Sequence, residues 1–535
     1  MKKLLLLIAT LLCLHEAGFS QVIPAYSITS LDTSRAAGYY LLSAYRLSGP
    51  NPAYPLRMIL DKFGRVVYIR KIAYGSGNDF KLSPNGLYSY NFGSRFYFQD
   101  SLFRIVDSVS CKNGIALDGH DIQVLPNGHY LLMGTETVTM NLSSYHMFNQ
   151  NGSPGSTSAS VKCGVIQELD ANRNVVFEWH AKDHYGFDDA DAGYFFSPMN
   201  VEWTHFNAIE MDTDGNILVS VRHFNEITKI NRSDSSIIWR LGGNRNQFTF
   251  TNDPPKFKGQ HDIRRIANGH ITLFDNGDQG VPVHPAIAKE YQLDVASMTA
   301  TLVWSYTENP NSYSLYTGNV QRLAGNTTLV NYGNMSDANL VFNVVDSSGS
   351  KIFEMSFPDT VASYRTYHVD SFPWSLPRPA LSCYSVAGQY YLDAGPGYSS
   401  YKWSTGATTQ TIPVTTPDTF NVFVPVMTGV GGYISSEYLV VTNPGNPCLV
   451  LSANEIEKPS FTLFPNPSNG KLSVTGYQLS GKTELKIYTV LGQKIFQSDA
   501  LFHSTGDEIQ IDVSEFPSGI YFLKLGNAVK KFVKE

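Results

Sequence analysis

The chain has 535 residues, of which 42% are hydrophobic and 16% charged, and its formal net charge is -6. This length is too great for a single hydrophobic core and predicts several domains. The acidic balance argues against nucleic acid as the main partner, because a nucleic-acid-binding domain would present a basic face. The 31 Tyr, 31 Phe, 43 Gly and 27 Pro residues favour a protein of strands and turns.

The N-terminus reads as a signal peptide over residues 1–20. Lys2 and Lys3 precede an apolar stretch from Leu4 to Leu14, and small residues follow before Gln21. The apolar stretch is too short for a lasting membrane span, and we expect no other segment to cross a bilayer. The sequence therefore predicts a secreted protein.

Four cysteines remain after this cleavage, namely Cys111, Cys163, Cys383 and Cys448. An oxidising compartment allows three pairings. Cys383 and Cys448 bracket one module, so we favour that pair, which leaves Cys111 with Cys163. No Cys or His spacing typical of a metal site is present, and we expect neither a metal nor a cofactor.

A repeat of short strands fills residues 21–370. Each unit reads strand, Asn-Gly or Asp-Gly turn, strand, and then a second pair of strands that often carries Trp, with Trp179, Trp239 and Trp304 expected in the core. Four strands per unit are typical of a propeller blade. Six units can be traced, roughly at 38–70, 80–112, 120–180, 205–240, 261–306 and 319–355. The fold class is therefore predicted as all-β, with a six-bladed β-propeller first.

Two smaller modules follow the repeat. Residues 380–450 alternate apolar and polar positions with turns every 8 to 12 residues, which predicts an immunoglobulin-like β-sandwich. Residues 459–535 read as a second, smaller β-sandwich with a basic end.

Three histidines occupy near-equivalent positions in successive units. His120 and His261 each lie eight positions before the turn glycine of their unit. In the unit between them Asn207 has that position, and His205 lies two residues upstream, which keeps both on one face of a strand. Arg222 ends the next strand, which runs antiparallel and returns to the level of His205. In a ring of blades these side chains would converge on one axis.

Each histidine alone could simply tie a loop by hydrogen bonds, but three in one register favour a site. His284, in a Pro-flanked loop, is expected to line its mouth. Three imidazoles could hold zinc, although a cation would be repelled by Arg222. Imidazole is also a nucleophile that forms covalent intermediates. Arg222, Asn207 and a protonated histidine would then stabilise a transferred anionic group.

The C-terminal module resembles the type A C-terminal sorting domain of the type IX secretion system. The resemblance rests on the opening Phe464-Pro465-Asn466-Pro467, the turn Leu491-Gly492-Gln493 and the strand Ser518–Leu525. It implies that the type IX secretion machinery is a partner and that the protein is exported across the outer membrane, to the cell surface or the medium.

The repeat resembles the bacterial arylsulfotransferase family of aryl-sulfate sulfotransferases, which use no nucleotide donor. The matching segments include Gly119–Ile122, Trp203–Ile209, Leu218–His223, Trp239–Gly243, Gln260–Asp262, Leu273–Gly277 and Val320–Gly333. The sequence contains no Gly-rich phosphate loop, which agrees with a sulfuryl donor that is not a nucleotide.

The resemblance implies a six-bladed propeller and ping-pong transfer from a phenolic sulfate ester to a phenolic acceptor through a sulfohistidine. By position, His261 matches the nucleophile. His205, Asn207 and Arg222 match residues that bind the sulfuryl oxygens or assist proton transfer, and His120 matches a further site histidine.

Two other functions stay open from the sequence. A non-catalytic surface propeller that binds a glycan or a protein would form no covalent intermediate and would tolerate replacement of His261. A metal-dependent propeller hydrolase would lose its activity with a chelator.

Overall fold

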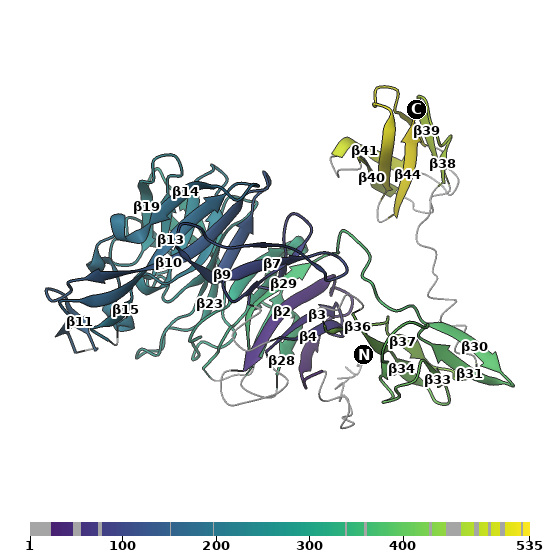
Figure 1. Cartoon of the computed structure of the whole chain (residues 1–535), viewed down its shortest axis with the longest axis horizontal. Helices are drawn as coiled ribbons and strands as arrows, with labels where there is room; N and C mark the ends of the chain where they lie inside the picture. Colours follow the sequence, from purple (N-terminus) through teal and green to yellow (C-terminus); the bar gives the residue numbers. More distant parts are fainter. Residues whose placement is uncertain are drawn as a thin grey trace, which may run out of the picture. The chain divides into compact units, whose positions relative to one another are not determined.

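The computed structural model describes residues 23–46, 55–72, 78–149, 151–195, 197–336, 340–357, 361–426, 431–445, 462–475, 481–489, 494–502, 509–525 and 528–535. In these ranges the regular elements are β-strands and five short 3-10 helices, so the prediction of an all-β chain is confirmed (Figure 1). No helix in these ranges has the length and apolarity that a membrane span requires. The predicted signal peptide lies outside them.

The described residues form two compact units. The first falls within Met1–Leu381, Ala394–Ile412 and Phe420–Tyr438, and the second within Ser382–Asp393, Pro413–Thr419 and Leu439–Glu535.

The first unit contains a series of antiparallel sheets built mostly from consecutive strands. One sheet has the order β5 (Lys81–Leu82), β6 (Tyr88–Phe92), β7 (Arg95–Gln99), β8 (Ile105–Val109). The next has the order β9 (Ala116–Val124), β10 (Tyr130–Met140), β13 (Ala159–Leu169), β14 (Val175–His180), with β15 (Asn200–Glu202) beside β13 and a hairpin of β11 (His146–Phe148) and β12 (Ser153–Pro154). A third has the order β16 (Phe206–Met211), β17 (Ile217–Val221), β18 (Glu226–Ile230), β19 (Ile237–Gly242).

Two further sheets follow the same plan. One has the order β21 (His261–Arg265), β22 (Ile271–Asp275), β23 (Ile287–Asp294), β24 (Thr299–Tyr306), with β20 (Thr249–Thr251) beside β24. The other has the order β25 (Asn319–Leu323), β26 (Thr327–Asn331), β27 (Leu340–Val345), β28 (Lys351–Ser356), β1 (Ser27–Leu31). The short helices are η1 (Ala181–Asp183), η2 (Phe187–Asp189), η3 (Ala192–Tyr194), η4 (Arg222–Phe224) and η5 (Ala324–Asn326).

One sheet combines strands from the beginning of the repeat region with a strand from its end. It has the order β29 (Val361–Val369), β2 (Tyr39–Arg46), β3 (Leu56–Asp61), β4 (Val66–Lys71), and it continues through β36 (Tyr433–Ser435), β35 (Val422–Pro425) and β32 (Lys402–Trp403). Tyr39 lies opposite Val369 in this sheet. The late strand β29 therefore completes a sheet that the early strand β2 begins, and the two lie side by side in Figure 1.

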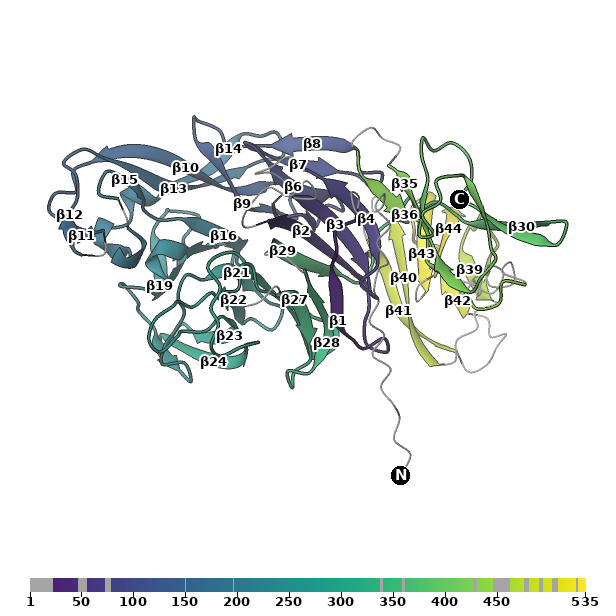
Figure 2. The same cartoon turned by 90° about the horizontal axis from the view of Figure 1, so that it is seen from below.

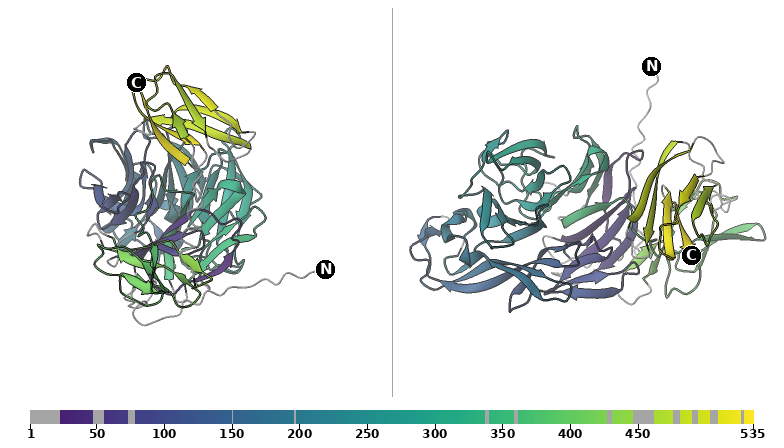
Figure 3. Two further views of the ribbon diagram at one scale, coloured as in Figure 1. Left: turned by 90° about the vertical axis from the view of Figure 1, so that its right-hand side faces the viewer. Right: turned by 90° about the horizontal axis from the view of Figure 1, so that it is seen from above.

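The first strands of the sheets meet at the centre of this unit. β16 contacts both β9 and β21, β21 contacts β25, β25 contacts β29, and β29 contacts β5. Figures 2 and 3 show the purple-to-green sheets following one another around these strands. Side chains near the ends of the innermost strands thus come from units far apart in the sequence.

The predicted turns set the register that brings these strand ends together. Gly128, Gly215 and Gly269 have φ of 80°, 79° and 85°, a backbone conformation that glycine adopts without steric cost. Each follows Asn or Asp and joins the first strand of its sheet to the second, as the sequence predicts. The three turn glycines therefore occupy equivalent positions in their units, which confirms the alignment on which the comparison of the histidines rests.

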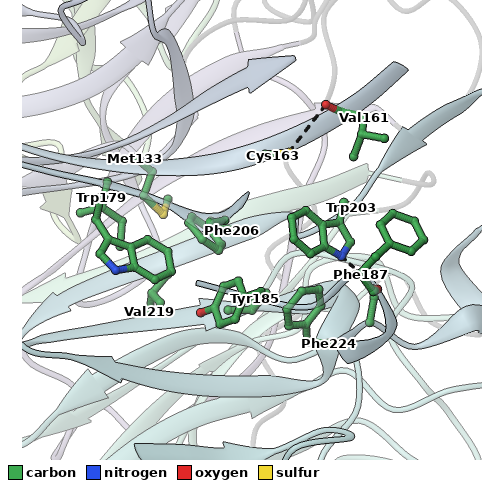
Figure 4. Close-up of a cluster of buried hydrophobic side chains, with 14 of the residues drawn as sticks. Met133, Val161, Cys163, Trp179, Tyr185, Phe187, Trp203, Phe206, Val219 and Phe224 are labelled. Carbon is green, nitrogen blue, oxygen red and sulfur yellow. Dashed lines mark hydrogen bonds between the residues drawn. The ribbon is translucent and has the colours of Figure 1, made fainter. Parts of the chain in front are cut away.

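Large aromatic side chains fill the space between neighbouring sheets. Trp179 and Trp239 are 1% and 2% exposed, which confirms their prediction as core residues, whereas Trp304 is only partly buried and packs against a core cluster. Trp179 belongs to a buried cluster with Tyr185, Phe206 and Val219, which joins the sheet of β13 to that of β16 (Figure 4).

The remaining strands lie C-terminal to this region. They are β30 (Ser382–Val386), which pairs with β31 (Gln389–Asp393), then β33 (Thr411–Pro413), β34 (Asp418–Phe420) and β37 (Leu439–Val441). The last segment contains β38 (Thr462–Phe464), β39 (Lys471–Thr475) and β42 (Ile509–Asp512) in one sheet, and β41 (Lys494–Phe502), β40 (Gly481–Thr489), β43 (Gly519–Leu525) and β44 (Ala528–Lys534) in another.

The predicted disulfide between Cys111 and Cys163 is wrong. Both are free thiols. The Cys111 sulfur lies against the carbonyl oxygen of Met133 on β10, whereas Cys163 is a residue of β13 and its sulfur faces the carbonyl of Val161, so the two thiols are directed to different strands. Cys383 is disulfide-bonded. Its predicted partner Cys448 lies outside the described residues.

Candidate functional site

Four of the predicted site residues lie at neighbouring ends of the innermost strands. His120 belongs to β9, His261 begins β21, and His205 directly precedes β16. Arg222 follows β17, and its backbone N–H donates to the carbonyl of His205 over 3.0 Å. The rings of His120 and His205 have centroids 5.0 Å apart. The structure therefore brings His205 together with Arg222 and with His120, as the strand register predicts.

The His261 imidazole is buried and held in one orientation. Its Nδ1 lies 2.7 Å from Asn276 Oδ1 and 3.0 Å from the carbonyl oxygen of Gly259, and both of these oxygens are acceptors. The backbone N–H of Thr317 donates to Nε2 over 3.2 Å. Nδ1 therefore carries the ring proton and Nε2 carries the lone pair.

The charge state of His261 follows from its surroundings. Burial, and then the positive charge of Arg222, lower the pKa of His261 well below its ordinary value of 6.5. The ring is thus a neutral imidazole near pH 7, with an unprotonated nitrogen. This is the form in which imidazole acts as a nucleophile.

His120 has the opposite character. Its Nδ1 is hydrogen-bonded to the Asp118 carboxylate, and its carbonyl accepts the hydroxyl proton of Tyr364 over 2.8 Å. Burial opposes the charged form, but the Asp118 carboxylate outweighs this effect and raises the pKa of His120. His120 therefore favours the protonated form more than an ordinary histidine does.

His205 stays neutral beside it. Its backbone φ is 50°, an uncommon value for a residue other than glycine. Its Nδ1 lies 3.1 Å from Glu202 Oε2, without a well-directed hydrogen bond. Burial lowers the pKa of His205, although Glu202 opposes this. Two adjacent imidazoles with pKa values shifted in opposite directions are arranged for acid and base roles.

Asn207 and Arg222 each offer a polar group that has no partner among the described residues. Asn207 is fully buried, and its Nδ2 donates to the carbonyl of Gln260 over 2.7 Å while Oδ1 has no partner there. Arg222 donates from Nη2 to the Leu315 carbonyl over 3.0 Å and lies over the ring of Tyr194, but its buried Nε is unpaired in the described ranges. A guanidinium with a free donor is suited to an oxyanion.

A cavity of about 570 Å³ opens next to these groups. Of the predicted site residues only Arg222 is part of its wall, whereas His261 is hydrogen-bonded to the wall residues Gly259 and Asn276. The volume is in the range of pockets for small ligands. The wall is formed by Gly193, Tyr194, Phe195, Ser197, Asn200, Val201, Glu202, Arg222, His223, Gly259, Asn276, Gly277, Asp278, Gln279, Tyr313, Ser314 and Leu315.

His284 is placed differently from the other predicted residues. Its Nε2 lies 2.9 Å from Asp275 Oδ2, a buried carboxylate that also binds Lys289, and His284 is not among the wall residues. Its imidazole is therefore hydrogen-bonded to a buried carboxylate and does not line the cavity.

The sequence interpretation missed Asn276, Thr317 and Glu202. Asn276 follows β22 as Arg222 follows β17, so the same register that predicts Arg222 contained the signal for Asn276. Thr317 approaches from the loop before β25, and its carbonyl accepts from Asn276 Nδ2 over 2.9 Å. Glu202 ends β15, and no local pattern marked it. Glu202, His205 and His223 are also grouped closely enough to hold a metal ion.

These parts define a class of site. The site combines a buried neutral imidazole, an arginine with an N–H that is unpaired among the described residues, and a neighbouring pair of imidazoles. Such groups suit the transfer of an anionic group. The chain belongs to the arylsulfotransferase (ASST) family, whose model matches residues 37–367. Residues 462–535 match the secretion system C-terminal sorting domain. Both resemblances are thereby confirmed, as is export across the outer membrane to the surface or the medium.

Several solved structures resemble the chain at low identity. A protein of unknown function from Bacteroides caccae is 13% identical, with 61% of this chain and 98% of that chain covered and a TM-score of 0.38. A catalytically inactive virginiamycin B lyase from Staphylococcus aureus with quinupristin is 10% identical, with 69% and 96% covered and a TM-score of 0.33. The β-propeller domain of Myceliophteria thermophila Cps50 is 9% identical, with 69% and 96% covered and a TM-score of 0.32. No curated protein sequence matches the chain.

Proposed function

We propose that the protein is an exported aryl-sulfate sulfotransferase that moves a sulfuryl group from a phenolic sulfate ester to a phenol through a sulfohistidine at His261. The observation that carries the proposal is the hydrogen bonding of His261, which leaves an unprotonated Nε2 on a buried ring beside a cavity.

In the first half-reaction His261 Nε2 attacks the sulfur of the donor. The bond between sulfur and the phenolic oxygen breaks, and its electron pair leaves with the phenolate. The new N–S bond gives His261 a positive ring, whose Nδ1–H stays bonded to Asn276 and Gly259. Arg222, whose Nε has no partner among the described residues, offers a cationic donor to the sulfuryl oxygens, and Asn207 comes from the same sheet.

Proton transfer falls to the imidazole pair. His120, which is hydrogen-bonded to Asp118, gives its proton to the departing phenolate. The neutral His205 is a base adjacent to it. In the second half-reaction an acceptor phenol loses its proton to the same pair and attacks the sulfur. The N–S bond then breaks and restores the neutral His261. No cofactor is needed for either step.

The domain organisation forms part of the proposal. We assign residues 1–20 to a cleaved signal peptide, 21–370 to a six-bladed propeller, 380–450 to an immunoglobulin-like module and 459–535 to the sorting domain. The contacts run from β9 through β16, β21, β25 and β29 to β5, and β6 and β7 of the β5 sheet contact β9, which supports six blades. The pairing of β36 with β4 supports a close association of part of the 380–450 segment with the first blade.

Intact-mass spectrometry of the mature protein tests the proposal. Brief mixing with p-nitrophenyl sulfate, without an acceptor, is expected to add one SO₃, about 80 Da, if a covalent intermediate forms. His261→Ala should abolish the adduct, while His270→Ala, which changes a histidine paired with Glu290 outside the site, should keep it. Nitrophenol release without an adduct, abolished by a chelator, would instead favour a metal hydrolase. Absence of both adduct and release would favour a binding propeller.

A further inference from the structure

We propose that Glu202, His205 and His223 form a binding site for a divalent transition-metal ion, with zinc as the best match, and that occupancy of this site stops sulfuryl transfer. The first half of this inference concerns metal binding alone. The second half rests on the proposed function, because it assigns a proton-transfer role to His205.

The three side chains are already gathered around one point. One ligand atom from each lies within 4.8 Å of the others. Glu202 Oε2 is 3.1 Å from His205 Nδ1, and the rings of His205 and His223 have centroids 4.9 Å apart. Small shifts of side chains would therefore bring all three atoms to bonding distance of a single ion.

The backbone holds the two histidines in place. The N–H of Arg222 donates to the carbonyl of His205 over 3.0 Å, and the N–H of His223 donates to the carbonyl of Thr204 over 3.3 Å. The segment before β16 and the short helix η4 are thus tied together at the site. A metal ion would find its ligands on a fixed frame, which reduces the entropy cost of binding.

Hydrogen bonding leaves His223 in the state that a metal ligand needs. Its Nδ1 lies 2.7 Å from the carbonyl oxygen of Glu202, which is an acceptor only. Nδ1 therefore carries the proton, and the lone pair is on Nε2. A histidine ligand commonly donates its other ring N–H to a carbonyl, which fixes the ring.

The composition of the site selects the metal. Two imidazoles and one carboxylate with a fourth position left open are a known zinc set, whereas calcium and magnesium take oxygen ligands. Glu202 and His223 are in the wall of the 570 Å³ cavity, so an ion can reach them and keep a water molecule as its fourth ligand.

Two nearby cations limit the affinity. Lys162 Nζ lies 3.0 Å from Glu202 Oε1 and competes for the carboxylate. Arg222 is adjacent to His223 in sequence, although its guanidinium is directed to Leu315. We therefore expect reversible binding, weaker than that of a dedicated structural zinc site.

Occupancy has a direct chemical consequence for His205. A metal bound to Nδ1 takes the one lone pair of a neutral imidazole, and the proton then resides on Nε2. Such a ring cannot accept a proton from a phenol. The metal thus acts as an inhibitor at this site and has no part in the transfer itself.

Titration of the metal-free mature protein with Co²⁺ alone tests the binding. We expect one equivalent to produce visible d–d absorption that Zn²⁺ displaces. Glu202→Gln and His223→Ala should each weaken the affinity by at least about 10- to 100-fold, because even the loss of a hydrogen-bonding partner of a metal ligand has an effect of that size. His270→Ala is the matched control and should bind as the wild type does. A flat titration, or full affinity in His223→Ala, overturns the inference.

A second measurement tests the inhibition. Zinc should lower the rate of nitrophenol release by the wild type, EDTA should restore it, and His223→Ala should lose zinc sensitivity relative to its own metal-free rate. A rate that rises with zinc, or equal sensitivity in His223→Ala, contradicts the inhibitory role. The cobalt titration uses no sulfate ester, so absence of sulfuryl transfer would refute the proposed function without deciding the metal site.

Discussion

Replacement of Arg365 by Met should destabilise the protein more than the loss of any exposed ion pair. Arg365 lies in β29, and its side chain is 1% exposed. Its guanidinium lies 3.0 Å from Asp79, 3.2 Å from Asp121 and 3.5 Å from Asp262, carboxylates with side chains 0–2% exposed. It also donates to the backbone carbonyl of Asn207 over 2.8 Å. One side chain therefore links four segments that surround the proposed site.

The magnitude follows from what remains after the change. Asp121 keeps two cations, Lys81 at 2.8 Å and Arg264 at 2.7 Å, and Asp79 keeps Lys81 at 2.6 Å. The network nevertheless loses one positive charge that balanced buried carboxylates. Removal of one partner of a buried pair costs about 3–5 kcal/mol, because it leaves a charge uncompensated. That is a large part of a typical stability of about 5–15 kcal/mol.

Urea unfolding followed by tryptophan fluorescence measures the effect. The control is Arg104→Met, since the Arg104 side chain is 58% exposed and pairs with Asp100 in the same surface turn, so its midpoint should lie close to that of the wild type. A loss below about 1 kcal/mol for Arg365→Met, the scale of a surface pair, would refute the reasoning.

Two further changes test parts of the site, and a third tests the contribution of the carboxyl group of Glu210 to stability. Asn276→Ala removes the nearer of the two acceptors of the His261 Nδ1–H and should lower kcat by about 10- to 100-fold, from a lost hydrogen bond of about 1–3 kcal/mol; an unchanged kcat contradicts this. Asp118→Asn removes the charge that raises the pKa of His120, so the fall of kcat/KM with rising pH should begin at lower pH; identical pH profiles would count against His120 as the acid. Burial raises the pKa of Glu210 from 4.5 to about 7, so the folded state binds this proton more tightly and stability falls as pH rises from 4.5 to 7. Glu210→Gln should flatten that fall in urea midpoints, and an unchanged slope would refute it.

The sequence predicted those parts of the site that depend on register. The turn glycine Gly128 placed His120 correctly on an innermost strand, because strand alternation and turn type are local properties, whereas His205, expected on one strand face with Asn207, directly precedes β16 with a φ of 50°. The antiparallel direction of the second strand likewise predicted that Arg222 lies at the level of His205. Local patterns were sufficient wherever the position of a side chain followed from its own hairpin.

Contacts between distant segments could not be read in this way. Thr317 reaches His261 from another sheet, and the Pro-flanked loop at His284 gave no sign of the Asp275 carboxylate that holds its imidazole. The proposed pairing of Cys111 failed for a similar reason. Sequence spacing gave no information on which strand each thiol faces.

The pairing of β29 with β2 also determines which truncated chains can complete the sheet that contains β2. A chain that ends before residue 361 leaves an edge of β2 without its neighbour, and an unpaired strand edge is a template for aggregation. The sorting domain at residues 462–535 is synthesised after β29, because translation runs from the N-terminus. A chain that carries its sorting domain has therefore already been synthesised beyond β29. Prematurely terminated chains lack this domain, and the order of the segments alone keeps open, aggregation-prone rings from being directed to the cell surface.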